Sequence, residues 1–179
     1  MSTDTDEANL AKDPGNRWLW RANLQQRLDA EALRDSLLAV SGELDTKIGG
    51  PPVAPGESNR RRTLYALIGR TKPDAEMALF DFPNPNGTSE QRMVTVGPMQ
   101  RLYFMNNEFV GNRAKALAER IATAGDTAAR ITLAYRLLYG REPKTDELRL
   151  GSEFVAKGPS AWPQYMQVLM ASAEFRSVN

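Results

Sequence analysis

The sequence predicts an all-α fold, a single-domain bundle of about six or seven helices with a proline-rich loop in its centre. Three features support this prediction. Apolar residues recur every three or four positions through most of the chain, which is the spacing of one helix face. Residues that typically begin or end helices flank these periodic segments. The connections between the later segments are only a few residues long, so consecutive helices should pack as neighbours.

The first long helix is expected after Asp29, which suits an N-cap, with Glu31 in the first turn near the positive end of the helix dipole. Its apolar face has a 4-3-4 spacing and comprises Leu33, Leu37, Val40 and Leu44. The solvated side should hold Arg27, Arg34 and Asp35. Glycines and prolines in residues 49–55 should end this segment in a loop.

The centre of the chain is less periodic. Residues 59–70 contain a short apolar run that fits a helix or a strand, and we favour a helix or an irregular segment. Residues 75–80 fit one or two helical turns. Pro83, Pro85 and Gly87 place residues 81–88 in a loop.

From Gly97 onwards the pattern indicates consecutive helices. Pro98 suits a first helical position, and Asn106 or Asn107 should cap the next helix. The apolar stripe of that helix comprises Val110, Ala114, Leu117 and Ile121. Three more helices are expected: from Asp126 to Gly140, from Thr145, which should be the N-cap, to Gly158, and from Ser160 onwards. The core face of the first of these three comprises Ile131, Ala134, Tyr135 and Leu138.

Composition excludes several classes of function. The 179 residues contain no His and no Cys, which removes the usual Ser-His-Asp and Cys-His systems and conventional zinc or iron–sulfur sites. The net charge of +1 argues against a dedicated nucleic-acid binder, and no apolar run is long enough to span a bilayer. We therefore expect no metal and no cofactor. Residues 1–14 are predicted to be a disordered or linker segment, and residues 15–179 a single helical domain.

Five residues are candidates for binding a ligand: Arg61, Asp81, Arg92, Gln100 and Asn106. Arg92 with Arg61 or Arg62 could bind an anion. Alternatively, Asp81 and Arg92 form an ion pair at the base of the loop they flank, and we favour this structural role.

Aromatic residues fall into two groups. Trp18 and Trp20 alternate in a short segment outside the main helices, so at least one is expected to be exposed and to pack on a partner. The others have helical spacing and are predicted to be core residues: Tyr103, Phe104, Trp162, Tyr165 and Phe175.

Six blocks of sequence occur in an order that resembles a known family. They are residues 13–35, Gly49-Gly50-Pro51-Pro52, residues 61–65, Phe80-Asp81-Phe82-Pro83, a segment with Ser89, Arg92, Thr95, Pro98 and Asn106, and an ending with Gly140-Arg141-Glu142-Pro143 and residues 162–175. In this order the chain resembles domain of unknown function 1553, a C-terminal domain of large planctomycete proteins. The resemblance implies a larger, exported parent protein that often carries a cytochrome-c-like domain. It also implies an extracytoplasmic location, and it supplies no activity.

Three hypotheses about function remain open. In the first, the chain is a non-catalytic helical module that packs against upstream domains of its parent or against another extracytoplasmic protein. In the second, it binds a glycan or an anion through its arginine and aromatic residues. The third, which we rank last, is a glycan-processing enzyme that uses carboxylates such as Asp81 and Glu108.

Overall fold

A computed structural model describes residues 7–14, 26–54 and 56–178 of the chain. These residues form eight α-helices, six of them longer than seven residues, so the all-α prediction is confirmed. The helices are α1 Glu7–Lys12, α2 Ala30–Ser41, α3 Ala75–Leu79, α4 Pro98–Asn106, α5 Glu108–Ile121, α6 Thr127–Tyr139, α7 Thr145–Val155 and α8 Ala161–Met170. Two residues each from β1 (Gln26–Arg27) and β2 (Ser177–Val178) pair antiparallel. Trp18 and Trp20 lie outside the described residues.

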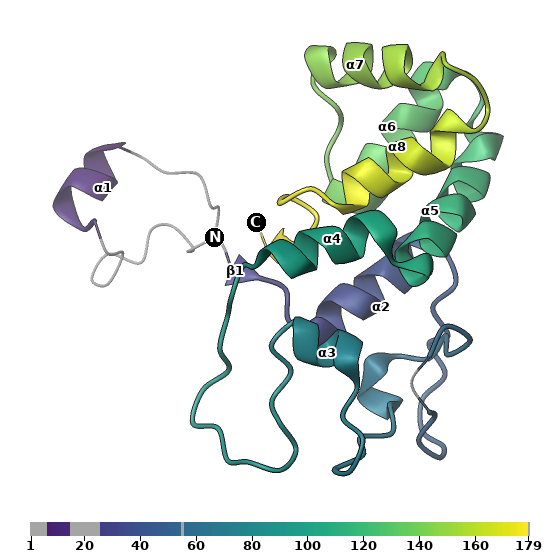
Figure 1. The fold of residues 1–179 in the computed structure, drawn as a ribbon. Coiled ribbons are helices and arrows are strands. Elements are labelled where there is room, and N and C mark those ends of the chain that lie inside the picture. Colours follow the sequence, from purple (N-terminus) through teal and green to yellow (C-terminus); the bar gives the residue numbers. More distant parts are fainter. Residues whose placement is uncertain (1–6, 15–25, 55, 179) are drawn as a thin grey trace.

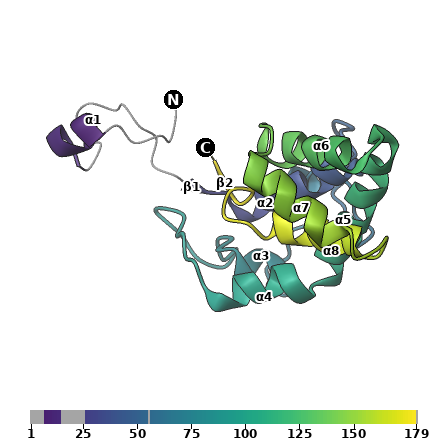
Figure 2. The same ribbon diagram turned by 90° about the horizontal axis from the view of Figure 1, so that it is seen from above.

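Helix α5 packs against α8, α2 and α4 (Figure 1). Seen from above, α3 and α4 lie on one side of α8, and α6 lies on the opposite side (Figure 2). The pairing of β1 with β2 brings the C-terminal segment beside the start of α2, where the Leu28 amide donates to the Arg176 carbonyl at 2.7 Å. No helix in the described part of the chain is long and apolar enough to cross a membrane.

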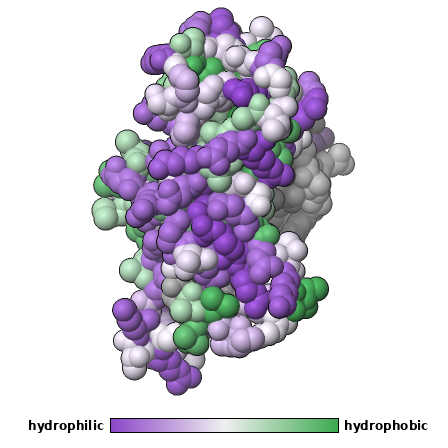
Figure 3. Space-filling view, turned by 90° about the vertical axis from the view of Figure 1, so that its right-hand side faces the viewer, coloured by the Kyte–Doolittle hydropathy of each residue, from purple (hydrophilic) through white to green (hydrophobic). Residues whose placement is uncertain are grey.

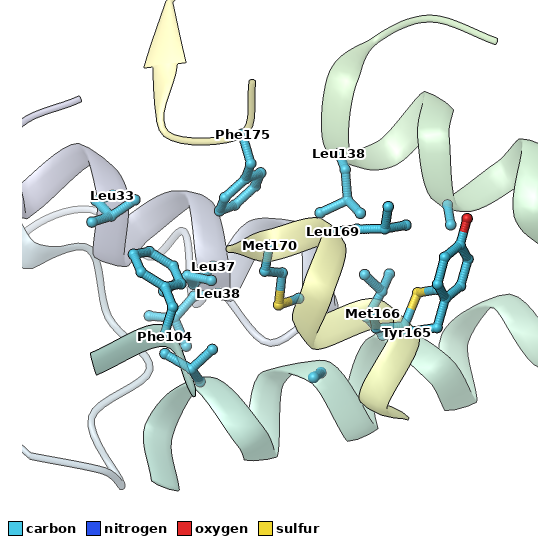
Figure 4. Packing of buried hydrophobic residues seen from close by; sticks show 14 of the residues in the cluster. Leu33, Leu37, Leu38, Phe104, Leu138, Tyr165, Met166, Leu169, Met170 and Phe175 are labelled. Atoms are coloured by element: carbon cyan, nitrogen blue, oxygen red, sulfur yellow. The ribbon is translucent and has the colours of Figure 1, made fainter. Parts of the chain in front are cut away.

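The core lies where these helices meet, and Figure 4 shows Phe104 of α4 close to Leu37 and Met170. The predicted stripe of α5 is confirmed, because Val110, Ala114, Leu117 and Ile121 are at most 1% exposed. Each large apolar side chain buried here contributes about 1.5–3 kcal/mol. The predicted core face of α6 is also buried, and so are Phe104, Tyr165 and Phe175. Tyr103 and Trp162 are half-buried against this core.

Most helix ends follow the local sequence signals. The carboxylates of Asp29 and Asp126 accept hydrogen bonds from the backbone amides of Ala32 and Ala129, both at 2.8 Å. Asn107, the second of the two predicted caps, begins α5 in the same way through the Phe109 amide. Gly140 ends α6 in the left-handed conformation, with φ 69°.

Three predictions about helix ends and faces are wrong. Helix α2 ends at Gly42, whose φ of 81° stops it seven residues before Gly49. Leu44 therefore lies outside the helix, and the fully buried Leu38 belongs to the core face. Thr145 is the first residue of α7 and not its cap.

Residues 59–70 are irregular, apart from one 3-10 turn at Thr63–Tyr65 and the isolated bridges of Arg61 with Asp45 and of Ala66 with Val53. Their contacts with α2 overturn a further prediction, because Arg34 and Asp35 do not face solvent. Arg34 donates to the Asn59 carbonyl at 2.5 Å, and Asp35 accepts from the backbone amide of Thr63 at 2.7 Å. The side chain of Arg27 is also turned inward and is 8% exposed. These polar side chains of α2 and the preceding strand fasten the irregular segments to the bundle.

Candidate functional site

Asp81 does not pair with Arg92, contrary to our prediction. It follows α3 in the left-handed conformation, with φ 64°, and its Oδ2 lies 2.5 Å from Nη2 of Arg27. The carboxylate also accepts from the backbone amide and the hydroxyl of Thr95, both at 2.8 Å. The Arg27 side chain is only 8% exposed. Asp81 thus ties both ends of the loop to the strand that precedes α2.

Arg92 binds the start of α2 instead. Its guanidinium donates to Glu31 at 2.6 Å and 2.8 Å and to Asp29 at 3.1 Å. Partial burial of Glu31 raises its pKa, but the hydrogen bonds from Arg92 outweigh this effect and the net pKa is lowered. Arg92 therefore holds the 82–96 loop against α2, and its charge is already matched by carboxylates.

The remaining candidates also have separate positions. Arg61 lies over the Tyr65 ring at 4.1 Å and donates to the carbonyls of Lys47 and Gly49 at 2.9 Å and 2.6 Å. Gln100 is 2% exposed and donates to the Leu79 carbonyl at 3.0 Å. Asn106 is exposed at the end of α4. Arg61 and Gln100 hold backbone segments in place, so the five predicted residues do not assemble into one ligand site.

The two carboxylates suggested for catalysis belong to different environments. Asp81 is held by Arg27 and Thr95, whereas Glu108 is exposed in the first turn of α5. Among the described residues, no group of three acidic side chains is placed to hold a metal ion. A cavity of about 40 Å³ beside Arg34 and Tyr103 has room for little more than water.

Sequence reasoning missed a charged network around Arg113. Its side chain is 2% exposed, and its Nε and Nη2 lie 2.6 Å and 3.0 Å from carboxylate oxygens of Glu43 and Glu57. Burial lowers the pKa of Arg113, and the two glutamates oppose that effect. The network joins α5 to the irregular segments that hold Glu43 and Glu57. The face of the molecule seen in Figure 3 is largely hydrophilic. The position of Arg113 beside Val110 and Ala114, on the apolar stripe of α5, could have predicted that its side chain is buried.

An apolar surface lies on the outer side of α4. Gln100 and Phe104 face the core, while Met99, Leu102 and Met105 are 63%, 46% and 66% exposed. The preceding segment adds three more exposed apolar side chains: Met93, Val94 and Val96. Val96 and Leu102 line one shallow depression together with Pro98 and Arg101. We call the six exposed residues, 93, 94, 96, 99, 102 and 105, the α4 apolar face.

A second apolar hollow lies between α3 and the adjoining loops. It has a volume of about 280 Å³ and is lined in part by Leu67, Ile68, Phe82 and Pro85, with Lys72 among its polar residues. Leu67 and Ile68 are 52% and 44% exposed. This groove is large enough for one or two apolar side chains of another molecule.

Comparison with protein families identifies one family to which the chain is similar. A profile of the PSD1 family, described as a protein of unknown function (DUF1553), matches residues 1–155. The chain belongs to this DUF1553 family. The match confirms the resemblance found in the sequence, and it ends at Val155, the last residue of α7, before α8 begins. No curated protein and no solved structure matches the chain significantly.

Proposed function

We propose that this DUF1553 domain is a non-catalytic docking module that packs through its α4 apolar face against another domain of the same polypeptide. The exposed row of Met99, Leu102 and Met105 carries this proposal. These residues recur every three positions, so they lie close together on one side of the helix. Soluble domains rarely leave a contiguous apolar patch uncovered unless it contacts something.

The composition of the face suits a protein surface. Three of its six residues are methionines, whose flexible side chains adapt to irregular apolar partners. Helix α4 is fixed from behind by Phe104, which is 1% exposed and packs edge-to-face with Tyr103 and Phe80. A firmly packed helix that presents an apolar outer side needs little reorganisation on binding, which favours affinity.

The proposed partner is the set of upstream domains of the parent protein. The family resemblance supports this choice, and it also supports an extracytoplasmic location. Trp18 and Trp20 are included in the proposed contact as aromatic anchors. Ligand binding is the second candidate, supported by the 280 Å³ groove, whose apolar walls and few polar groups are typical of small-molecule sites.

Calorimetric titration of this domain with the separately produced upstream domains tests the proposal. We expect micromolar or tighter binding that Leu102→Asp weakens at least about tenfold, because a charge on the apolar face must be desolvated. Val168→Asp is the matched control, since Val168 is 57% exposed on α8, outside the α4 apolar face. Absence of binding, or equal weakening by both substitutions, would contradict the proposed contact. Replacing Trp18 and Trp20 by Ala tests their contribution separately.

A further inference from the structure

The groove beside α3 has walls that hydrogen bonds within the chain hold in place. One wall comes from residues 67–73, which precede α3, and the other comes from residues 82–85, which follow it. The side-chain amide of Asn86 donates to the Arg70 carbonyl at 2.8 Å and thus ties the two loops together. Three of the lining residues are prolines, which restrict the backbone further. The groove is therefore largely preformed, so binding needs little ordering of these loops.

The interior of the groove is apolar. Helix α3 contributes Met77 and Ala78, and the two walls contribute Leu67, Ile68 and Phe82. The groove has a volume of about 280 Å³. An apolar cavity of roughly 150 Å³ already holds a benzene molecule. The space beside α3 therefore suits an aromatic ring with a short chain, or a branched aliphatic group of similar size.

The charge next to this apolar space is positive. Lys72 lines the groove, Arg70 lies two residues before it, and both side chains are exposed. Neither side chain forms an ion pair or a hydrogen bond with the described residues. Asp74 also lines the groove, but its carboxylate caps α3 by accepting from the Met77 amide at 2.9 Å. The opposite wall, residues 82–85, carries no charge. An anionic group on a ligand would therefore complement the charge at the edge of the groove.

We propose that this groove binds a small organic acid, a molecule with an aromatic or branched aliphatic body and one carboxylate. The body packs against Ile68 and Phe82, and the carboxylate accepts charge-assisted hydrogen bonds from the ammonium of Lys72. Because Lys72 is exposed, the carboxylate keeps its contact with water and its charge is not buried. The proposal rests on the second candidate function, ligand binding in this groove, and it is independent of docking through the α4 apolar face.

Titration of the whole chain with 3-phenylpropionate, followed by methyl NMR, tests the proposal. The comparison compound is 3-phenylpropanol, which has the same body and no charge. We expect the methyl signals of Leu67, Ile68 and Met77 to shift with saturation, with a dissociation constant for the acid below about 1 mM. The alcohol should bind about three- to fivefold more weakly, because it cannot form the exposed charge pair with Lys72.

Three substitutions locate the two parts of the ligand. Lys72→Gln should raise the dissociation constant of the acid to that of the alcohol and leave the affinity for the alcohol unchanged. Lys115→Gln is the matched control, because Lys115 is an exposed lysine of α5 outside the groove. Ala78→Met, at an exposed position of α3, should place a side chain in the groove and weaken the binding of both compounds.

Two kinds of result would overturn the proposal, and they differ in what they leave standing. If the wild-type chain bound the acid and the alcohol equally, or if Lys72→Gln and Lys115→Gln had equal effects, the carboxylate assignment would fail while ligand binding in the groove remained. If neither compound shifted the signals of Leu67, Ile68 and Met77 with saturation, both the proposal and the candidate function on which it rests would fail.

Discussion

Replacing Arg141 by Met should lower the free energy of unfolding by about 1–2 kcal/mol at neutral pH. The difference between the wild-type and Arg141→Met proteins should disappear in acid. Arg141 follows α6 and joins it to two other segments. Its guanidinium donates to both carboxylate oxygens of Glu147 at 2.8 Å. It also donates to both oxygens of Glu174, at 2.6 Å and 2.8 Å. One side chain therefore connects the end of α6, the first turn of α7 and the C-terminal segment.

The magnitude follows from the pKa of Glu147. Hydrogen bonds from Arg141, opposed by partial burial, hold this pKa at about 2, below its ordinary value of 4.5. One pKa unit corresponds to about 1.4 kcal/mol, so the shift sets an upper limit of roughly 3.4 kcal/mol. The side chains of Arg141 and Glu147 are 33% and 30% exposed, and solvent screening reduces the expected value to about 1–2 kcal/mol.

The direction of the pH dependence is fixed by the same shift. Because the folded pKa of Glu147 lies below the unfolded one, its contribution is complete above about pH 4.5 and disappears as the pH falls towards 2. Urea unfolding of the wild-type and Arg141→Met proteins at about pH 7, 4 and 2.5 measures the difference. Arg149→Met is the control, since its exposed ion pairs should contribute about 0–1 kcal/mol. The prediction would be refuted if Arg141→Met lowered the free energy of unfolding by less than about 0.5 kcal/mol at neutral pH. It would also be refuted if the difference between the two proteins did not become smaller in acid.

Two further substitutions test close contacts in the bundle. Gly151→Ala should destabilise the domain by about 1–3 kcal/mol, because the new Cβ would lie 2.4 Å from Oη of Tyr165. Urea unfolding measures this loss of stability, and a smaller loss in a Tyr165→Phe background would show that the clash is with the Tyr165 hydroxyl. Asp81→Ala should lower the free energy of unfolding by about 3 kcal/mol, because it leaves the buried guanidinium of Arg27 without its carboxylate partner. A thermal midpoint equal to that of the wild type would contradict this prediction.

Local signals in the sequence predicted much of the fold. Asp29 and Asp126 cap their helices because a short carboxylate reaches the free amides of the first turn wherever the chain continues as a helix. Gly140 ends α6 because the left-handed conformation costs it little. The stripe of α5 is buried as predicted, because its period of 3.6 residues leaves only one side for the core.

Long-range contacts were beyond such reasoning. Arg92 is near Asp81 in the sequence, but the partner of Asp81 is Arg27, 54 residues away, because the strand pair and α3 bring the two together. The apolar outer side of α4 was also missed. Met99, Leu102 and Met105 look like core residues in the sequence, and only the packing of Phe104 inward shows that they face out.

Methyl NMR of the methionines tests docking through the α4 apolar face most directly. The chain has seven methionines, of which Met77, Met166 and Met170 are at most 6% exposed and Met93, Met99 and Met105 at least 63%. On addition of the upstream domains, we predict that the methyl signals of the three exposed residues shift and lose contact with solvent. The signals of the three buried residues should stay in place and serve as an internal control. Binding that leaves the signals of Met93, Met99 and Met105 unchanged would show that the partner docks elsewhere.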